Sequence, residues 1–180
     1  MNCEKLLKQA AYELIGKKSI DKVTVNDILK TAEVSKQTFY RHYHDKYELG
    51  NALYDDLFIK DIYILDSVRN GTDWENMYLR QFAIFRHHME LTKNLFSSRE
   101  QGCAVDYEVQ HCIAFDKAFL HRQGANIEDP IILFALEAKD VGGTFAMRKW
   151  ILGDMQVSDD EMVHRFKLII PSILTPYFCN

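Results

Sequence analysis

The chain has 180 residues, of which 47% are hydrophobic and 27% charged, so it is long enough for one compact fold or for a small module joined to a larger one. No apolar run approaches the roughly 20 residues that a membrane-spanning helix needs, and the N-terminus lacks the continuous apolar core of a signal peptide. We therefore expect a cytoplasmic protein without a membrane partner. Taken by itself, the net charge of −4 argues against a nucleic-acid partner.

The charges are unevenly distributed along the chain. Residues 1–46 hold nine Lys or Arg and six Asp or Glu, whereas residues 47–180 hold thirteen basic and twenty acidic residues. The first quarter is therefore basic by three charges and the remainder acidic by seven. Such an asymmetry favours a local anion-binding surface near the N-terminus.

Helical periodicity dominates the chain, which has only three prolines and eight glycines and no convincing alternation of apolar and polar residues. We expect an all-α fold. A first helix is predicted over about residues 3–17 and a second, short one over 25–32. Thr24 is placed to cap the second helix, and Asp27 three residues later completes a capping-box pattern.

Two further helix starts follow within about twenty residues. Ser35 is a good N-cap, and Asp45 with Glu48 makes a second capping box. Two short helices joined by a turn of a few residues, with a third packed behind them, are typical of a helix-turn-helix. We predict that the helix after Ser35 is its second, exposed helix.

At 100° per residue, the helix after Ser35 divides into two faces. Phe39 and Tyr43 point toward the core, whereas Arg41, Gln37 and Thr38 form a polar face suited to base edges in a major groove. An ordinary solvated surface remains an alternative on spacing alone. The residues expected at a DNA interface, on base edges or on the flanking phosphates, are Thr24, Ser35, Lys36, Gln37, Thr38, Tyr40, Arg41, His42 and Lys46.

The run from Thr24 to Leu49, "TVNDILKTAEVSKQTFYRHYHDKYEL", resembles the N-terminal domain of the TetR (tetracycline-repressor) family of transcriptional regulators. The shared positions include the opening Thr, an apolar "I-x-x-x-A", "V-S", "T-F-Y", a following aromatic residue, and a Lys with a Leu three residues later. Glu33, Ser19 and Tyr43 depart from the family pattern, which has Gly, Gly and Phe at these places. The segment "QTFYRHYHDKYEL" is also similar to a subgroup that includes dihydroxyacetone-kinase regulators.

This resemblance implies a helix-turn-helix DNA-binding domain over residues 1–48 and a helical ligand-sensing and dimerisation domain over residues 49–180. It implies a homodimer that binds a palindromic operator, most simply as a repressor, and that an unknown small-molecule effector releases. Some members of the subgroup resemble coactivators that work through a partner protein, so a coactivator with little DNA affinity of its own is the alternative. Two DNA-binding domains whose recognition helices lie one turn of the DNA helix apart would read a palindrome.

The body is predicted to contain long helices over residues 73–96, 105–124, 128–154 and 158–174, the last kinked or ended by Pro171. Asp129 and Pro130 are a favourable cap and first residue. The resemblance places the dimer interface on the last two long helices. Gly142 and Gly143 in mid-helix are consistent with a close packing seam there.

The effector site is predicted only as a set of side chains on the central helices. No Gly-rich phosphate loop, G-x-S-x-G or H-E-x-x-H motif is present, so we expect neither an enzyme nor a cofactor. The histidines lack the spacing of a helical zinc site, and no metal is expected. Cys3, Cys103, Cys112 and Cys179 are expected to be free thiols, with a redox sensor on Cys103 or Cys112 as the alternative. The candidate ligand-contacting residues are Phe82, Phe85, His88, Tyr107, His111, Phe115, Met147 and Trp150.

Overall fold

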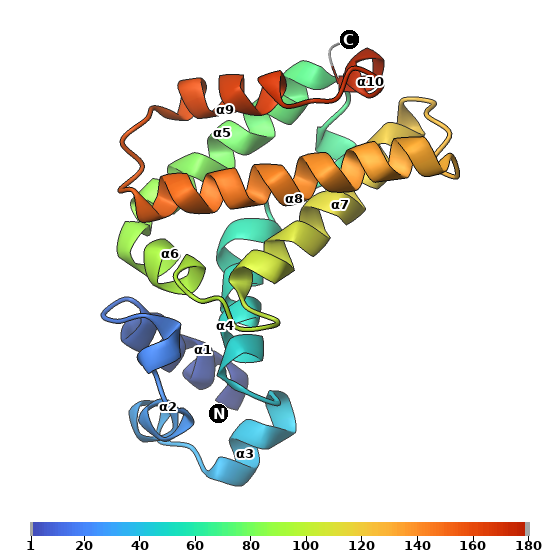
Figure 1. The fold of residues 1–180 in the computed structure, drawn as a ribbon. Helices are drawn as coiled ribbons and strands as arrows, with labels where there is room; N and C mark the ends of the chain where they lie inside the picture. The colour runs from blue at the N-terminus through green and yellow to red at the C-terminus, as the bar shows by residue number, and fades with distance from the viewer. Residues whose placement is uncertain (1, 179–180) are drawn as a thin grey trace.

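All secondary structure in the computed structural model, which describes residues 2–178, is helical, and no strand occurs among these residues (Figure 1). The predicted all-α class is confirmed. The N-terminal helices lie below the larger group of helices that follows them, and α4 runs between the two parts. The N-terminal helices are α1 (Cys3–Ile15), α2 (Val25–Ala32), α3 (Lys36–His42) and α4 (Lys46–Tyr54).

The N-terminal helices begin where the capping residues predict. Thr24 Oγ1 accepts a hydrogen bond from the Asp27 amide at 3.1 Å, and Asp27 Oδ2 accepts one from the Thr24 amide at 3.2 Å, which completes the capping box. Ser35 Oγ accepts from the Thr38 amide at 3.1 Å. The second predicted capping box is wrong in one respect, because the Glu48 carboxylate accepts from the His44 amide and not from the Asp45 amide. Asp45 still caps α4 through the amides of residues 47 and 48.

A small apolar core joins the first helices of the chain. α1 packs against α2, α3 and α4. Leu7, Ile28, Phe39 and Leu49 are fully buried, and Tyr43 is nearly so. The sequence therefore orients α3 correctly, with Phe39 and Tyr43 fixing one face against α1 and leaving the other face to solvent.

Helix α4 does not stop where the N-terminal head ends. It begins at Lys46, runs to Tyr54 and continues as a π-helical turn over Asp55–Ile59. The boundary expected between residues 48 and 49 falls inside this helix, and the division into two domains at that point stays a prediction. Because α4 is continuous across this boundary, the orientation of the head depends on how the second half of α4 packs on the body.

The body differs from the prediction in two places. The helix expected over residues 73–96 is broken at His88, whose φ of −110° and ψ of 39° are not helical. The break turns α6 so that it packs on α8 and α1. The helix expected over residues 158–174 ends at Leu168, ahead of Pro171. The helices of the body are α5 (Gly71–His87), α6 (Met89–Phe96), α7 (Ala104–Arg122), α8 (Pro130–Leu152), α9 (Asp159–Leu168) and the short α10 (Thr175–Phe178).

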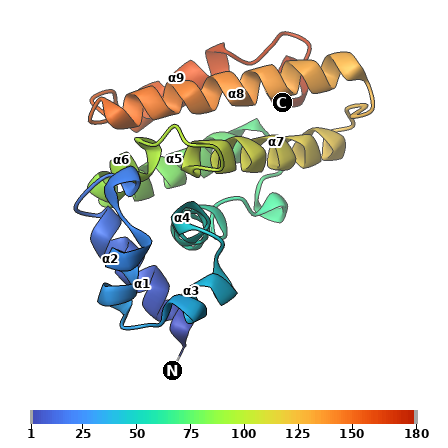
Figure 2. The same ribbon diagram turned by 60° about the horizontal axis from the view of Figure 1, so that its bottom comes forward.

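Head and body meet along α1 and α6 and along α4 and α7 (Figure 2). The Tyr12 hydroxyl lies 3.1 Å from His88 Nδ1, at the break between α5 and α6. Asn94 Nδ2 donates to the carbonyl oxygen of Ile15 at 2.7 Å. These polar contacts join the second half of α1 to α6 and to the break between α5 and α6. A movement of α6 would therefore change the position of the head.

No helix within the described range is long and apolar enough to cross a membrane. Cys103 and Cys112 are buried thiols without a disulfide, while Cys179 lies outside the described residues. Burial raises the pKa of the Cys112 thiol well above its usual value, which disfavours the reactive thiolate.

Candidate nucleic-acid interface and ligand site

The outward side of α3 is a continuous polar surface. Lys36, Gln37, Arg41 and His42 are exposed, and Tyr40 is 48% exposed. The Tyr40 ring packs edge-on against Phe39, with centroids 5.2 Å apart, and the Lys36 ammonium lies 5.8 Å from its centre. Arg41 forms no ion pair with any residue in the described range. Both views place α3 at the end of the molecule farthest from α8 and α9 (Figures 1 and 2).

The hydroxyl groups predicted at the interface are also used inside the head. Thr24 and Ser35 cap α2 and α3, and the Thr38 hydroxyl lies 2.9 Å from Ser35 Oγ. Their oxygens retain free lone pairs, and each hydroxyl can still be shared with a second partner. The three side chains border the exposed face of α3 and also have structural roles in the head.

Lys46 lies in the first turn of α4, as the sequence predicts, and its side chain is also used inside the head. Its ammonium donates to the carbonyl oxygens of Asp21 and Val23, at 2.8 and 2.9 Å, and so fixes the 3₁₀ turn Ile20–Lys22 against the start of α4. Two of its three N–H donors are therefore committed within the chain. One donor remains for an external anion.

Glu33 lies in the turn between α2 and α3, at a position where the family pattern has Gly. Glu33 has φ 52° and ψ 41°, in the left-handed region. This conformation costs a non-glycine residue about 1 kcal/mol or more. The turn keeps its shape in spite of that strain.

The predicted ligand residues do not line one cavity. Phe82 contacts both Phe85 and Trp150 ring to ring, at centroid distances of 6.3 and 4.9 Å, and all three rings fill the core. Phe115 packs against Tyr63. Of the predicted set, Met147 alone lines the small cavity between α5, α7, α8 and α9.

The remaining predicted ligand residues lie apart from that cavity. Tyr107 and His111 contact each other on α7, with ring centroids 4.5 Å apart. His88 lies at the break after α5, where burial and the adjacent His87 lower its pKa. Within residues 2–178 no group of three or more His, Cys, Asp or Glu side chains is placed to hold a metal ion.

Sequence reasoning missed a buried polar cluster on the inner face of α7. The Glu108 carboxylate is fully buried and accepts from the Tyr54 and Tyr63 hydroxyls, at 2.9 and 2.8 Å, and from Gln81 Nε2 at 2.9 Å. Burial raises the pKa of Glu108, although these hydrogen bonds oppose the shift. In the sequence, the signal for this cluster is that Glu108 falls at helical spacing with apolar residues of the same helix.

A second buried cluster, also missed, joins α7 to α8. Lys139 donates to Asp116 at 2.6 Å and to Asp140 at 2.5 Å, and Trp74 Nε1 donates to Asp116 at 3.1 Å. The Lys139 ammonium also lies over the rings of Trp74 and Phe178. The signal for this cluster was adjacent Lys and Asp in the middle of an otherwise apolar helix.

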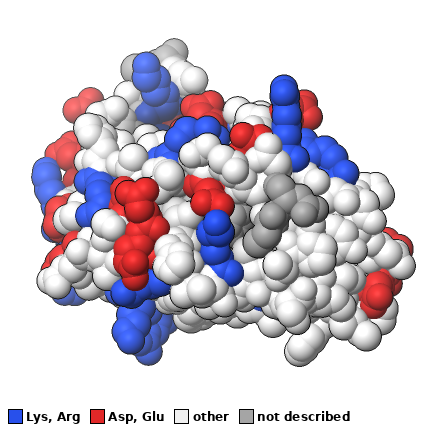
Figure 3. All heavy atoms as spheres, turned by 90° about the horizontal axis from the view of Figure 1, so that it is seen from above, with Lys and Arg blue, Asp and Glu red and all other residues white. Residues whose placement is uncertain are grey.

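The outer surface of α8 and α9 carries large exposed apolar side chains. Figure 3, which looks down on this end of the molecule, shows a broad area without charged side chains on one side. A Cβ added to Gly142 would meet no described atom within 4 Å. The exposed apolar residues of this surface, which we call the α8–α9 face, are Ile131, Phe134, Val141, Phe145, Leu168 and Ile169.

The sequence profile described as "Bacterial regulatory proteins, tetR family" matches residues 7–53, which span the head from α1 to α4. The chain is also 28% identical over 112 residues to the uncharacterized HTH-type transcriptional regulator YvdT of Bacillus subtilis (strain 168). That match covers 59% of this chain and 55% of the relative, so it spans about half the length of the relative.

Solved structures share the fold of the whole chain. The dihydroxyacetone kinase operon activator DhaS superimposes with a TM-score of 0.61 at 14% identity, covering 98% of both chains. RolR without ligand superimposes with a TM-score of 0.56 at 16% identity, covering 96% of this chain and 94% of that one. The similarity in fold therefore extends through the body as well as the head.

Proposed function

This chain belongs to the TetR family of bacterial regulatory proteins, and we propose that it is a sequence-specific DNA-binding regulator whose α3 enters the major groove. The observation that carries the proposal is the outward face of α3. Gln37 and Arg41 are exposed there, while Phe39 and Tyr43 anchor the opposite face in the core of the head. Arg and Gln are side chains that read base edges through paired hydrogen bonds.

Residues around this face are assigned to the DNA backbone. Tyr40, His42 and Lys36 are exposed beside Arg41, and Thr24 and Ser35 lie at the starts of α2 and α3. We assign Lys46 to the same role through its third N–H donor, because its other two are held by carbonyl oxygens. Contacts to phosphates fix register and orientation without reading sequence.

The active unit in this proposal is a homodimer formed by the α8–α9 face. Phe134 and Leu168 are 73% and 70% exposed, which is costly for a monomer in water. Gly142 lies on α8 with open space beside it, and close approach of a partner's backbone would account for a glycine in mid-helix. Such a dimer would present two copies of α3 to the two halves of a palindrome.

Regulation is proposed to work by a shift between two arrangements of head and body. An effector that binds the body better in one arrangement changes the distance between the two α3 helices and so the affinity for DNA. The supporting contacts are the continuation of α4 into the body and the polar contacts between α1 and α6. In the simplest case, the effector lowers the affinity for DNA and releases a repressor from its operator.

A coactivator that works through a protein partner is the second candidate. Its support is the similarity in fold to a protein described as an operon activator, over 98% of both chains. Glu33 adds a negative charge to the exposed turn just before α3, which would oppose a nearby phosphate. Under this candidate the head needs little DNA affinity of its own.

Recovery of bound fragments from sheared genomic DNA of the source organism, at low and at near-physiological salt, tests the proposal. One palindromic site retained at the higher salt would support a dimeric, sequence-specific regulator. Arg41→Ala should then weaken that site by about 1–3 kcal/mol and spare random DNA. The matched control Lys36→Ala should weaken both and lower the salt slope by about one.

Two results would contradict the proposal. Equal loss on specific and random DNA from Arg41→Ala would remove the base-reading role of this side chain. Recovery of salt-sensitive random fragments alone would favour the coactivator candidate, which affinity capture of a defined protein partner on the immobilised full-length chain would then test.

A further inference from the structure

A chain of polar contacts runs from α8 through the end of α6 to the head. It begins at Arg148 of α8, whose guanidinium donates to the carbonyl oxygens of Phe96 and Ser97, at 2.8 and 3.2 Å. The last carbonyl oxygens of a helix have no partner inside that helix, and a cation beside them also stabilises the negative end of the helix dipole. Arg148 forms no ion pair with a carboxylate within residues 2–178. Its donors therefore hold the end of α6.

The same end of α6 contacts the head through a pair of hydroxyl groups. Ser97 Oγ lies 2.6 Å from Ser19 Oγ, which also accepts from the Asp21 amide in the 3₁₀ turn Ile20–Lys22. Because the Ser97 hydroxyl donates to the carbonyl oxygen of Asn94 at 2.9 Å, the Ser19 hydroxyl is the donor of the pair. Ser19 stands where the family pattern has Gly, which has no side chain to make this contact. The contact therefore depends on a position at which this chain departs from its family.

The turn Ile20–Lys22 is fixed in turn to the start of α4, which follows α3. The Lys46 ammonium accomplishes this by donating to two carbonyl oxygens in and directly after the turn. The turn is also packed tightly between α4 and α6, since a Cβ added to Gly50 would come within 2.6 Å of Ile20 Cδ1 and 3.5 Å of Leu95 Cδ2. A displacement of the end of α6 would therefore move the start of α4 and, with it, α3.

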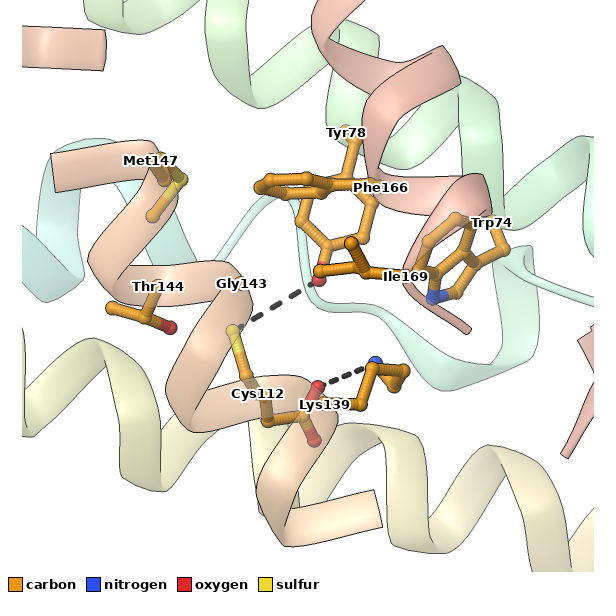
Figure 4. Close-up of a pocket in the computed structure, with 10 residues that line it drawn as sticks. Trp74, Tyr78, Cys112, Lys139, Gly143, Thr144, Met147, Phe166 and Ile169 are labelled. Atoms are coloured by element: carbon orange, nitrogen blue, oxygen red, sulfur yellow. Dashed lines mark hydrogen bonds and ion pairs between the residues drawn. The ribbon is translucent and has the colours of Figure 1, made fainter. Parts of the chain in front are cut away.

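Helix α8 is held firmly in the body, so it can serve as the fixed end of these contacts. The Lys139 ammonium is paired with Asp116 of α7 at 2.6 Å, and Met147 is 1% exposed. Figure 4 shows the inward side chains of α8 around a cavity that they share with Trp74 and Tyr78 of α5. The cavity has a volume of about 10 Å³, room for about one water molecule, and such close packing leaves α8 little freedom to shift. The outer side of α8 carries the α8–α9 face.

We propose that Arg148, Ser97 and Ser19 form a latch between body and head, the α6 latch, which sets the distance between the two α3 helices of the dimer. All three are positioning residues, because they act through α6 and the turn Ile20–Lys22. The α8–α9 face fixes α8 of one copy against the other copy, and the α6 latch fixes each head to its own α8. The protein then selects palindromes whose half-site separation matches this distance. The role in DNA reading rests on the proposed function as a dimeric regulator, whereas the mechanical link does not.

Operators that differ only in the separation of their half-sites test the α6 latch. One base pair more or less moves the second half-site by about 3.4 Å and by about 35° around the DNA axis. The wild-type protein should bind its own spacing at least about tenfold more tightly than either neighbour, because protein or DNA must deform to fit the others. Arg148→Ala and Ser19→Ala should each reduce this preference several-fold and leave the affinity for a single half-site unchanged. The double variant should reduce it little further, since both residues act in one chain of contacts.

Two substitutions serve as controls for the loss of charge. Arg148→Lys keeps the charge and can still donate to a carbonyl oxygen at the end of α6, so it should restore much of the spacing preference. Arg80 is exposed on α5, and Arg80→Ala removes the same charge without touching the α6 latch. This variant should keep the full preference. Circular dichroism of each variant shows that the comparison is made between folded proteins.

Hydrogen–deuterium exchange provides a second measurement that needs no DNA. The Lys22 and Val23 amides donate to carbonyl oxygens of the turn, at 2.9 and 3.1 Å. In Arg148→Ala these amides should exchange at least several-fold faster, although Arg148 touches no part of the head, because the end of α6 no longer holds Ser19 in place. A role of Arg148 confined to α6 would speed exchange in α6 alone.

Two outcomes overturn the inference. If both Arg148→Ala and Ser19→Ala kept the full spacing preference, the α6 latch would not set the distance between the α3 helices. If exchange in Arg148→Ala became faster in α6 alone, the contacts would not act as one chain. A wild-type protein that binds no palindrome would instead contradict the proposed function and with it the role in spacing, while the exchange measurement decides the mechanical link by itself.

Discussion

Replacing Tyr43 with Phe should stabilise the protein. The Tyr43 side chain is 6% exposed, and its hydroxyl has no hydrogen-bond partner within the described part of the chain. Burial raises the pKa of this hydroxyl to about 12. An unpaired buried hydroxyl costs about 1–3 kcal/mol in lost hydration, while the Phe ring keeps the contacts with Phe39 and α1. We expect a gain of about 1 kcal/mol in the free energy of unfolding, or about 2–4 °C in Tm.

Urea unfolding followed by circular dichroism measures this gain, and Tyr54→Phe is the matched control. The Tyr54 hydroxyl is also fully buried but donates to Glu108 Oε2 at 2.9 Å. Its removal leaves a buried carboxylate oxygen short of a donor and should cost about 1–3 kcal/mol, the opposite sign. If Tyr43→Phe lowered stability by as much as Tyr54→Phe, the Tyr43 hydroxyl would have to be hydrogen-bonded, and the reasoning from burial would be refuted.

Three further changes test the head, the dimer and the buried carboxylates. Gly142→Ala should stabilise the α8 helix by about 1 kcal/mol but weaken dimerisation, measured by analytical ultracentrifugation, and an unchanged dimer would contradict close packing at Gly142. Lys46→Ala should lower the stability of the head by about 1–3 kcal/mol, because two carbonyl oxygens lose their donor; urea unfolding that matches wild type would refute this. Asp140 has a folded pKa of about 8, above the unfolded value of about 4, so its proton stabilises the fold fully below about pH 4 and this contribution disappears as the pH rises to about 8. Asp140→Asn should therefore show a smaller loss of stability between about pH 5 and pH 8 than wild type, and equal losses would contradict the assigned shift.

The head could be predicted well because its signals are local. Thr24 with Asp27, and Ser35 with the Thr38 amide, decide helix starts within four residues of sequence. The apolar spacing of Phe39 and Tyr43 decides which face of α3 is buried. Lys46 could not be placed in the same way, because the carbonyl oxygens that hold its ammonium belong to a turn 23 to 25 residues earlier.

The body was harder to predict because its decisive contacts join distant segments. No Pro or Gly in the sequence indicates the break at His88, which depends on packing of α6 against α1 and α8. Helix α8 has apolar residues on both sides, so periodicity alone does not say which side is buried. The structure buries Lys139 and Asp140 and exposes Phe134 and Phe145, the reverse of what hydrophobicity suggests. Ion pairing with Asp116 on another helix makes this possible.

The two buried carboxylates of α7 offer a physical route from the cavity to the head. Glu108 and Asp116 lie eight residues apart on one face, with Cys112 between them. Asp116 is held by Lys139 of α8, and Glu108 by the hydroxyl of Tyr54 at the end of α4. A buried carboxylate that loses a donor is strongly destabilised, so α4, α7 and α8 are constrained to move together. A change in the pairing of Asp116 with Lys139 would shift α7, and that shift would reach α4 through the hydrogen bond between Glu108 and Tyr54.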